Sequence, residues 1–276
     1  MFSRARPCET PATVDPNRHA PDLPSHAAAV LPLLHLRGAR RLPANALVLG
    51  STAPDLVYLV GTLGAAAHHP RGLLSSCLPA GLLAFLYVEA LLLPVVGPWL
   101  VASSPARARP TLARLLGPRP LPRTFGAWLL VLLALLVGAA THQLWDGFTH
   151  AWMWPARALY PTTTVSLLGH TVLLSRALQH LSGVLGLVVV VAYLRRATAP
   201  ALAASEPGER ADAARRLLAL LTVPLVAGCV AAFMQLRDPH PLLTRALWDA
   251  AWSATAWFAL LLGLECLGLR LYRASR

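Results

Sequence analysis

Apolar residues gather in five long stretches, which short polar or arginine-rich segments separate. Each stretch is about as long as the ~20 residues that an α-helix needs to cross the hydrocarbon core of a bilayer. Three prolines interrupt the first stretch, which we therefore expect to be bent or tilted. The pattern predicts five membrane-spanning helices, at residues 73–101, 125–144, 178–194, 217–236 and 247–269.

Two shorter apolar segments precede the first of these helices. They run over residues 26–36 and 44–55, and each would be roughly 17 Å long as a helix, which is too short to cross a bilayer alone. Ser25 is a good N-cap for the first segment. Folded as an antiparallel hairpin with an arginine-rich turn, the two segments would place His26 beside Asp55 at one end.

The composition supports a membrane protein. Hydrophobic residues make up 56% of the 276 residues and charged residues only 13%, against about 25% in soluble domains. The fold class that we predict is all-α: a polytopic helical membrane protein with about five full spans plus a short N-terminal helical hairpin. The predicted parts are a flexible, proline-rich extension at 1–24, a membrane core with the His and Asp residues at 25–195, and two further transmembrane helices at 196–276.

The net charge of +12 comes entirely from arginine, because the chain contains no lysine. A pI near 11.1 in a soluble protein would indicate nucleic-acid binding. Here the arginines cluster in the segments 102–124 and 195–216 and in the C-terminal tail, where they more simply set the topology. The sequence thus predicts no nucleic-acid partner, a lipid bilayer as the surroundings, and a cytoplasmic C-terminus.

The most informative segment for chemistry lies at the end of the second predicted span. His142 and Asp146 are four residues apart and share one face of a helix, so both can bind one metal ion, with nitrogen and oxygen each about 2.0–2.2 Å from zinc. The hairpin and the residues before the first span bring further donors to the same end. The predicted metal ligands are His26, Asp55, His69, His142 and Asp146, with His68, His150 and Arg71 as additional candidates.

These residues also allow simpler interpretations. His142 and Asp146 could hydrogen-bond each other or cap the helix at the membrane–water interface. Arg71 could bind a phosphate bidentately or serve only as a topology charge. Glu89, inside the first span, could pair with a buried arginine or histidine or line the site.

Three motifs resemble a bacterial membrane family known as Domain of Unknown Function 4184. They are Ser25-His26-Ala-Ala-Ala-Val30-Leu31-Pro32-Leu33, Leu49-Gly50-Ser51-Thr52-Ala53-Pro54-Asp55 and Thr141-His142-x-x-Trp145-Asp146-x-Phe148-Thr149-His150. The resemblance covers about residues 22–195 and implies a cytoplasmic (inner) membrane location. It implies no activity. The chain departs from the family pattern at His68-His69, where a single Thr-His is expected.

The same order of residues is similar to membrane-bound metal-dependent hydrolases of the YdjM type and, more distantly, to the zinc-dependent phospholipase C fold. Their pattern corresponds here to His26, Pro54-Asp55, His69-Pro70-Arg71-Gly72 and His142-x-x-x-Asp146. Leu74 and Ser75 stand where the YdjM pattern has a further histidine. These likenesses imply a metal-hydrolase site.

Together these observations predict a membrane-embedded metal-dependent hydrolase with a divalent ion, zinc by its ligand types, acting on an amphipathic or lipid-like phosphoester. Asp55 or Asp146 would be catalytic, orienting the water or acting as general base. The alternative is a non-enzymatic membrane protein or transport component with a polar His/Asp core or proton relay. Haem ligation by paired histidines is a third hypothesis.

Overall fold

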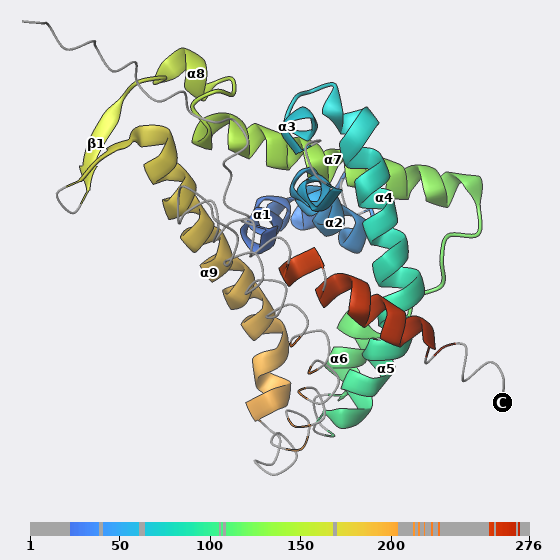
Figure 1. Ribbon diagram of the computed structural model, residues 1–276. Helices are drawn as coiled ribbons and strands as arrows, with labels where there is room; N and C mark the ends of the chain where they lie inside the picture. Colours follow the sequence, from blue (N-terminus) through green and yellow to red (C-terminus); the bar gives the residue numbers. More distant parts are fainter. Residues whose placement is uncertain are drawn as a thin grey trace, which may run out of the picture.

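The computed structural model describes the chain from residue 23 to residue 203, apart from 39–40, 61–63, 105, 107–108 and 168–169; beyond that it describes only 212, 215, 218, 222, 226, 254–256, 258–268 and 270. Within these residues the protein is mostly helical (Figure 1). Most of the predicted flexible extension and most of the predicted span 217–236 lie outside the described residues.

The predicted N-terminal hairpin consists of α1 (Leu23–Val30), a 3-10 turn η1 (Pro32–His35) and α2 (Ala44–Leu56). The first helix begins at Leu23, before the predicted cap at Ser25, and ends at Val30; Pro32 is the first residue of the 3-10 turn that follows. A 3-10 turn η3 (Val57–Val60) and the short α3 (Gly64–Ala67) lead to the first long helical run. Helices α1 and α2, which form the predicted hairpin, pack against each other, as the sequence predicts.

The first long run changes helix type along its length. It consists of a π-helical turn η4 (Leu73–Cys77), α4 (Leu78–Leu86), a second π-helical turn η5 (Tyr87–Leu92) and α5 (Leu93–Ser103). Each π-helical turn ends two residues before a proline, Pro79 or Pro94, whose missing N–H interrupts the regular α-helical ladder. The remaining helices are α6 (Arg109–Leu116), α7 (Phe125–Thr149), α8 (Ala156–Leu159) and α9 (Leu174–Ala203).

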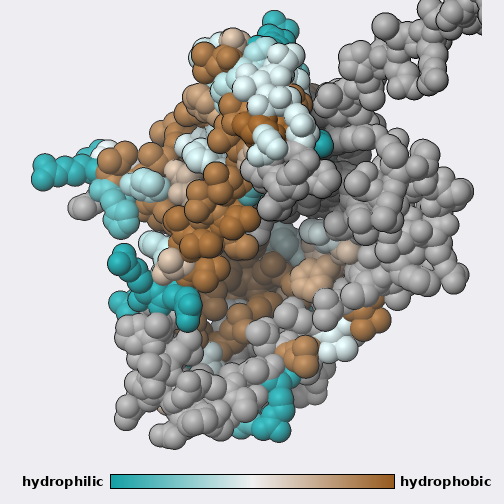
Figure 2. All heavy atoms as spheres, turned by 90° about the vertical axis from the view of Figure 1, so that its left-hand side faces the viewer, coloured by the Kyte–Doolittle hydropathy of each residue, from teal (hydrophilic) through white to brown (hydrophobic). Residues whose placement is uncertain are grey.

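Three helical stretches of the described residues are long and apolar enough to cross a membrane: Leu73–Ala102, Phe125–Thr149 and Leu174–Arg196. They correspond to the first three predicted spans. The last predicted span is helical over the shorter apolar segment Ala254–Gly268. Figure 2 looks onto the side of the molecule on which α9 lies, and apolar side chains cover much of its coloured surface. On α9 these exposed side chains include Leu181, Val184, Leu185, Leu187, Val188, Val189 and Val191.

A two-stranded antiparallel hairpin corrects the all-α prediction. It pairs β1 (Thr164–Leu167) with β2 (His170–Leu173), with Thr164 opposite Leu173. The β-branched Thr164, Val165, Thr171 and Val172 favour this conformation. Four-residue strands are too short to leave a clear alternating pattern in the sequence.

Helix α2 occupies the centre of the bundle, between α1, α4 and α7 (Figure 1). Two glycines allow the backbones of α2 and α7 to approach closely. A Cβ at Gly50 would lie 2.3 Å from the carbonyl oxygen of Leu135, and one at Gly138 would lie 2.3 Å from that of Leu47. The main core forms beside this contact, from Val30, Ala46, Leu47, Phe85, Val131, Ala134 and Leu135. This approach brings the ends of α2 and α7 together where the predicted site residues lie.

Candidate metal centre

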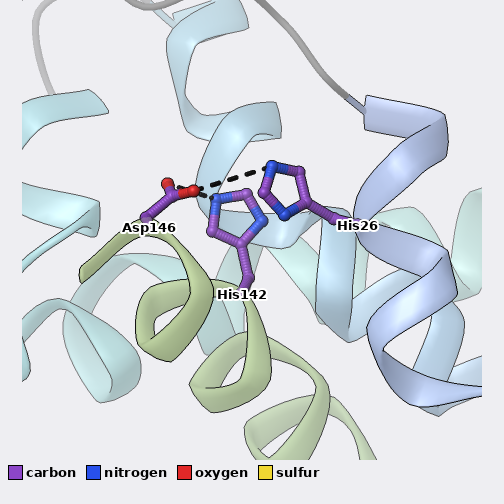
Figure 3. A group of neighbouring side chains, drawn as sticks. All are labelled: His26, His142 and Asp146. Atoms are coloured by element: carbon purple, nitrogen blue, oxygen red, sulfur yellow. Dashed lines mark ion pairs between the residues drawn. The ribbon is translucent and has the colours of Figure 1, made fainter. Parts of the chain in front are cut away.

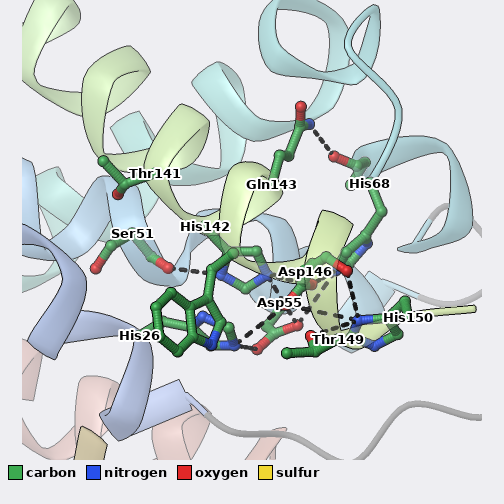
Figure 4. Close-up of polar contacts among 12 residues, drawn as sticks. His26, Ser51, Asp55, His68, Thr141, His142, Gln143, Asp146, Thr149 and His150 are labelled. Carbon is green, nitrogen blue, oxygen red and sulfur yellow. Dashed lines mark hydrogen bonds and ion pairs between the residues drawn. The ribbon is translucent and has the colours of Figure 1, made fainter. Parts of the chain in front are cut away.

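Six titratable side chains meet beyond this glycine contact, and each is at most 7% exposed: His26, Asp55, His68, His142, Asp146 and His150 (Figure 4). They come from α1, α2, the turn after α3, and the last two turns and the C-cap of α7. Helix α7 continues through Gly147 to Thr149, so the His142–Asp146 face is intact. Burial of so many polar groups requires compensating partners.

Two carboxylate oxygens of this cluster each lie within 3.7 Å of the same two imidazole nitrogens. The Nε2 atoms of His68 and His142 are 3.4 Å apart. Asp146 Oδ2 lies 3.2 Å from the first nitrogen and 3.0 Å from the second. Asp55 Oδ1 lies 3.5 and 3.7 Å from the same two nitrogens. Ligands about 2.0–2.1 Å from a tetrahedral zinc ion lie roughly 3.3 Å apart, so these five distances are close to those between the ligands of such a site.

His26 closes the cluster on another side. Its ring stacks on that of His142, with the ring centres 3.8 Å apart. Its Nε2 lies 3.7 Å from Asp146 Oδ1 (Figure 3) and 4.0 Å from Asp55 Oδ2. The helical hairpin thus places His26 beside Asp55, as its predicted geometry requires. Two triads have ligand atoms within 4.8 Å of one another and could hold a metal ion: His26 with His142 and Asp146, and Asp55 with His68 and His142.

The backbone of α2 orients the imidazole of His142. His142 Nδ1 lies 2.7 Å from the carbonyl oxygen of Ser51, and a carbonyl can only accept a hydrogen bond. Nδ1 therefore carries the proton, and Nε2 is the nitrogen directed at the two carboxylates. A histidine that ligates a metal characteristically donates its other N–H in this way.

Gln143 fixes the turn that carries His68. Its side-chain amide donates to the carbonyl oxygens of Ala67, at 2.6 Å, and His69, at 3.0 Å, on either side of His68. The thiol of Cys77 also donates to Ala67, at 3.1 Å. The sequence pattern predicts no role for Gln143, although this residue directly follows His142; its polar side chain near the end of an apolar helix was the available signal.

One predicted ligand, His69, lies outside the cluster, whereas the additional candidate His68 lies within it. His68, and not His69, points into the cluster; His69 is exposed, and its ring centre lies 5.7 Å from that of Trp152. Trp152 also lies against the cluster itself, with its ring centre 6.4 Å from that of His68 and 6.1 Å from that of His150. His69 and Arg71 instead line a surface cavity of about 540 Å³, together with Ala66, Pro70, Gly72 and Ser75.

Glu89 lies outside this cluster. It is buried in η5, where Asn45 Nδ2 donates to it at 2.5 Å and Arg119 Nη1 lies 3.2 Å away. Asn45 is in the first turn of α2 and Asp55 in the last, so the two polar groups occupy opposite ends of that helix. The pairing with arginine is one of the two roles that the sequence allowed.

The side chains of the cluster differ in how their surroundings shift their pKa values. Burial opposes a charge on His68, but hydrogen bonds to Asp146 and Asp55 outweigh it and raise its pKa to about 10. Burial also opposes a charge on Asp55, yet the imidazoles of His142 and His68 hold its pKa below the ordinary value. At His26, burial and the neighbouring His142 lower the pKa to about 4. The ionised carboxylate of Asp55 therefore faces a protonated His68 and a neutral His26.

Fold and site together define a mostly helical protein with candidate membrane spans and a buried His/Asp cluster that could hold a metal ion. The chain belongs to the family described as Domain of unknown function (DUF4184), whose model matches residues 21–266. The match extends well past residue 195, where the sequence resemblance ended, and so includes the described residues 254–256 and 258–266.

No curated protein and no solved structure matches the chain. The resemblances to YdjM-type hydrolases and to the phospholipase C fold therefore stay predictions.

Proposed function

We propose that the protein is a membrane-embedded metal-dependent hydrolase that acts on a lipid-like phosphoester. The observation that supports this most directly is a group of four buried ligand atoms from His68, His142, Asp55 and Asp146, in which each carboxylate oxygen lies 3.0–3.7 Å from both imidazole nitrogens. Two imidazoles and two carboxylates suit zinc, and would also accept manganese or iron. Asp55 and Asp146 are ligands in this proposal as in the sequence prediction, and His68 takes the place of His69.

A divalent ion held there would lower the pKa of a water molecule toward ~7 and so make a nucleophile available at neutral pH. The chain's own task is to orient that water and accept its proton. Asp55 Oδ2 and Asp146 Oδ1 are suited to accepting this proton, because both belong to buried carboxylates. Neither atom is among the four ligand atoms that would hold the ion.

The cavity beside the cluster suits the substrate head group. Four of its lining residues, His69 to Gly72, follow His68 directly in the chain, and Arg71 supplies an exposed guanidinium that can bind a phosphate through two parallel hydrogen bonds. The candidate span that starts at Leu73 begins immediately after Gly72. A substrate with a phosphate at the interface and an apolar part in the bilayer would fit this arrangement.

The test is a metal and activity measurement on the full chain, purified in detergent without chelator. We expect about one or more zinc, manganese or iron per chain and hydrolysis of short-chain phosphodiester or phosphomonoester lipids. Asp146→Asn should lose both. His180→Ala is the matched control, because His180 is an exposed histidine on α9, and it should retain both. Absence of metal in folded, zinc-supplemented wild-type protein would contradict the proposal.

A second candidate function rests on the raised pKa of His68. A proton on that imidazole would bridge Asp55 and Asp146 without any metal, as in the polar core of a proton-relay or transport protein. The same metal analysis separates the two functions, because the relay binds no ion with a fixed stoichiometry.

A further inference from the structure

The two oxygens of each carboxylate in the cluster face different imidazoles. Asp55 Oδ1 lies 3.5 Å from His68 Nε2, whereas Asp55 Oδ2 lies 4.0 Å from His26 Nε2. Asp146 Oδ2 lies 3.0 Å from His142 Nε2, whereas Asp146 Oδ1 lies 3.7 Å from His26 Nε2. Both carboxylates therefore lie between two sets of ligand atoms. The first set consists of His68 Nε2, His142 Nε2, Asp55 Oδ1 and Asp146 Oδ2. The second set consists of His26 Nε2, Asp55 Oδ2 and Asp146 Oδ1.

The second set is spaced too widely for hydrogen bonds. Its nitrogen–oxygen distances of 3.7 and 4.0 Å exceed the 2.7–3.2 Å typical of an N–H···O bond. Asp55 Oδ2 is fully buried and has no hydrogen-bond partner among the described residues. A buried carboxylate oxygen in this state is costly, and a cation between it and the facing imidazole would remove that cost.

We infer that the cluster binds two metal ions, with Asp55 and Asp146 as bridging carboxylates and His26 as the ligand that belongs to the second ion. The inference rests on the proposed function, since the first ion occupies the set already described. His150 is the nearest additional imidazole on this side, because its Nδ1 lies 3.7 Å from the same Asp146 oxygen that faces His26. His26 thereby has a role distinct from that of His68 and His142.

Two ions would suit a phosphoester in particular. Carboxylate-bridged metal pairs are known from other helical bundles, where histidines and acids project inward from facing helices. Such pairs stabilise both the attacking and the leaving oxygen of a phosphoryl displacement. A bridging carboxylate keeps further lone pairs, so Asp55 and Asp146 can still accept a hydrogen bond from the attacking water.

The test counts ions and measures whether they are neighbours. The full chain in detergent is stripped with chelator, saturated with Mn²⁺ and desalted, after which bound manganese is measured by elemental analysis and by electron paramagnetic resonance. We expect two Mn²⁺ per chain with an exchange-coupled spectrum. His26→Ala and His26→Gln should bind one ion and give the six-line spectrum of isolated Mn²⁺. His35→Ala, at an exposed histidine of the same hairpin, should behave as wild type.

Each other outcome has a distinct meaning. One ion per chain with an isolated spectrum in the saturated wild type overturns the second site and leaves the proposed function standing. Two coupled ions that persist in both His26 variants overturn the assignment of His26. No stoichiometric metal in the wild type overturns both proposals. The wild-type spectrum decides the question even if a His26 variant fails to fold.

Discussion

His142 donates through Nδ1 to the carbonyl oxygen of Ser51, 2.7 Å away, and this contact joins the central helices α2 and α7 beside the candidate metal centre. The bond needs the α2 and α7 backbones to lie unusually close. Gly138, one turn before His142, provides that closeness, because a Cβ there would lie 2.7 Å from the backbone nitrogen of Ser51. The position of His142 therefore depends on a helix–helix contact at Gly138, a residue that cannot itself bind a metal ion.

Gly138→Val should consequently separate α2 from α7 and disrupt the centre. Overpacking of this kind costs about 1–3 kcal/mol, and here the obstacle is backbone, which cannot rotate away. We expect a lower melting temperature in detergent and at least a tenfold weaker affinity for Zn²⁺, measured by competition with a chromophoric chelator. Gly126→Val is the matched control in the same helix, since nothing lies within 4 Å of a Cβ at Gly126. Equal behaviour of the two variants would refute the role of this contact.

Gln143 should act on the metal through the position of His68. Gln143→Met keeps the approximate size of the side chain but removes the amide that donates to the carbonyls of Ala67 and His69. Loss of such an outer partner typically weakens metal affinity 10–100-fold, and we expect that range with little change in stoichiometry at saturation. Leu144→Met, at an exposed neighbouring position of α7, is the control. Unchanged affinity in Gln143→Met would show that the turn holds His68 without it.

The sequence predicts those parts of the site that follow from regular helix geometry. The four-residue spacing of His142 and Asp146 is preserved in α7, and the short lengths of the two N-terminal segments correctly predict that His26 meets Asp55. The sequence could not decide which of His68 and His69 faces the cluster, because these neighbours lie in a turn where no periodicity applies. Gln143 was missed because its partners are backbone carbonyls, which leave no mark in a sequence.

The polar group around Glu89 should affect stability and leave the metal centre intact. Arg119→Met would remove the guanidinium from the buried Glu89 carboxylate and leave the amide of Asn45 in contact with it, at a cost of about 1–3 kcal/mol given the partial exposure of Arg119. We expect a lower melting temperature with unchanged metal content. The double variant Glu89→Gln/Arg119→Met should recover much of the stability, since no buried charge is left. Loss of metal in Arg119→Met would instead indicate that the two ends of α2 are coupled.

Metal binding should release protons, because His68 must lose its proton to become a ligand. Its pKa of about 10 means that it is protonated at neutral pH in the metal-free protein, whereas His26, with a pKa of about 4, is already neutral and Asp55 already ionised. Raising the pH from 6 to 9 therefore removes competition at His68, and the apparent Zn²⁺ affinity should rise by up to about tenfold per pH unit. Titration calorimetry in two buffers of different ionisation enthalpy measures the released protons directly. We expect at least one per first ion in the wild type and fewer in His68→Gln; an affinity independent of pH over this range would show that His68 is not a ligand.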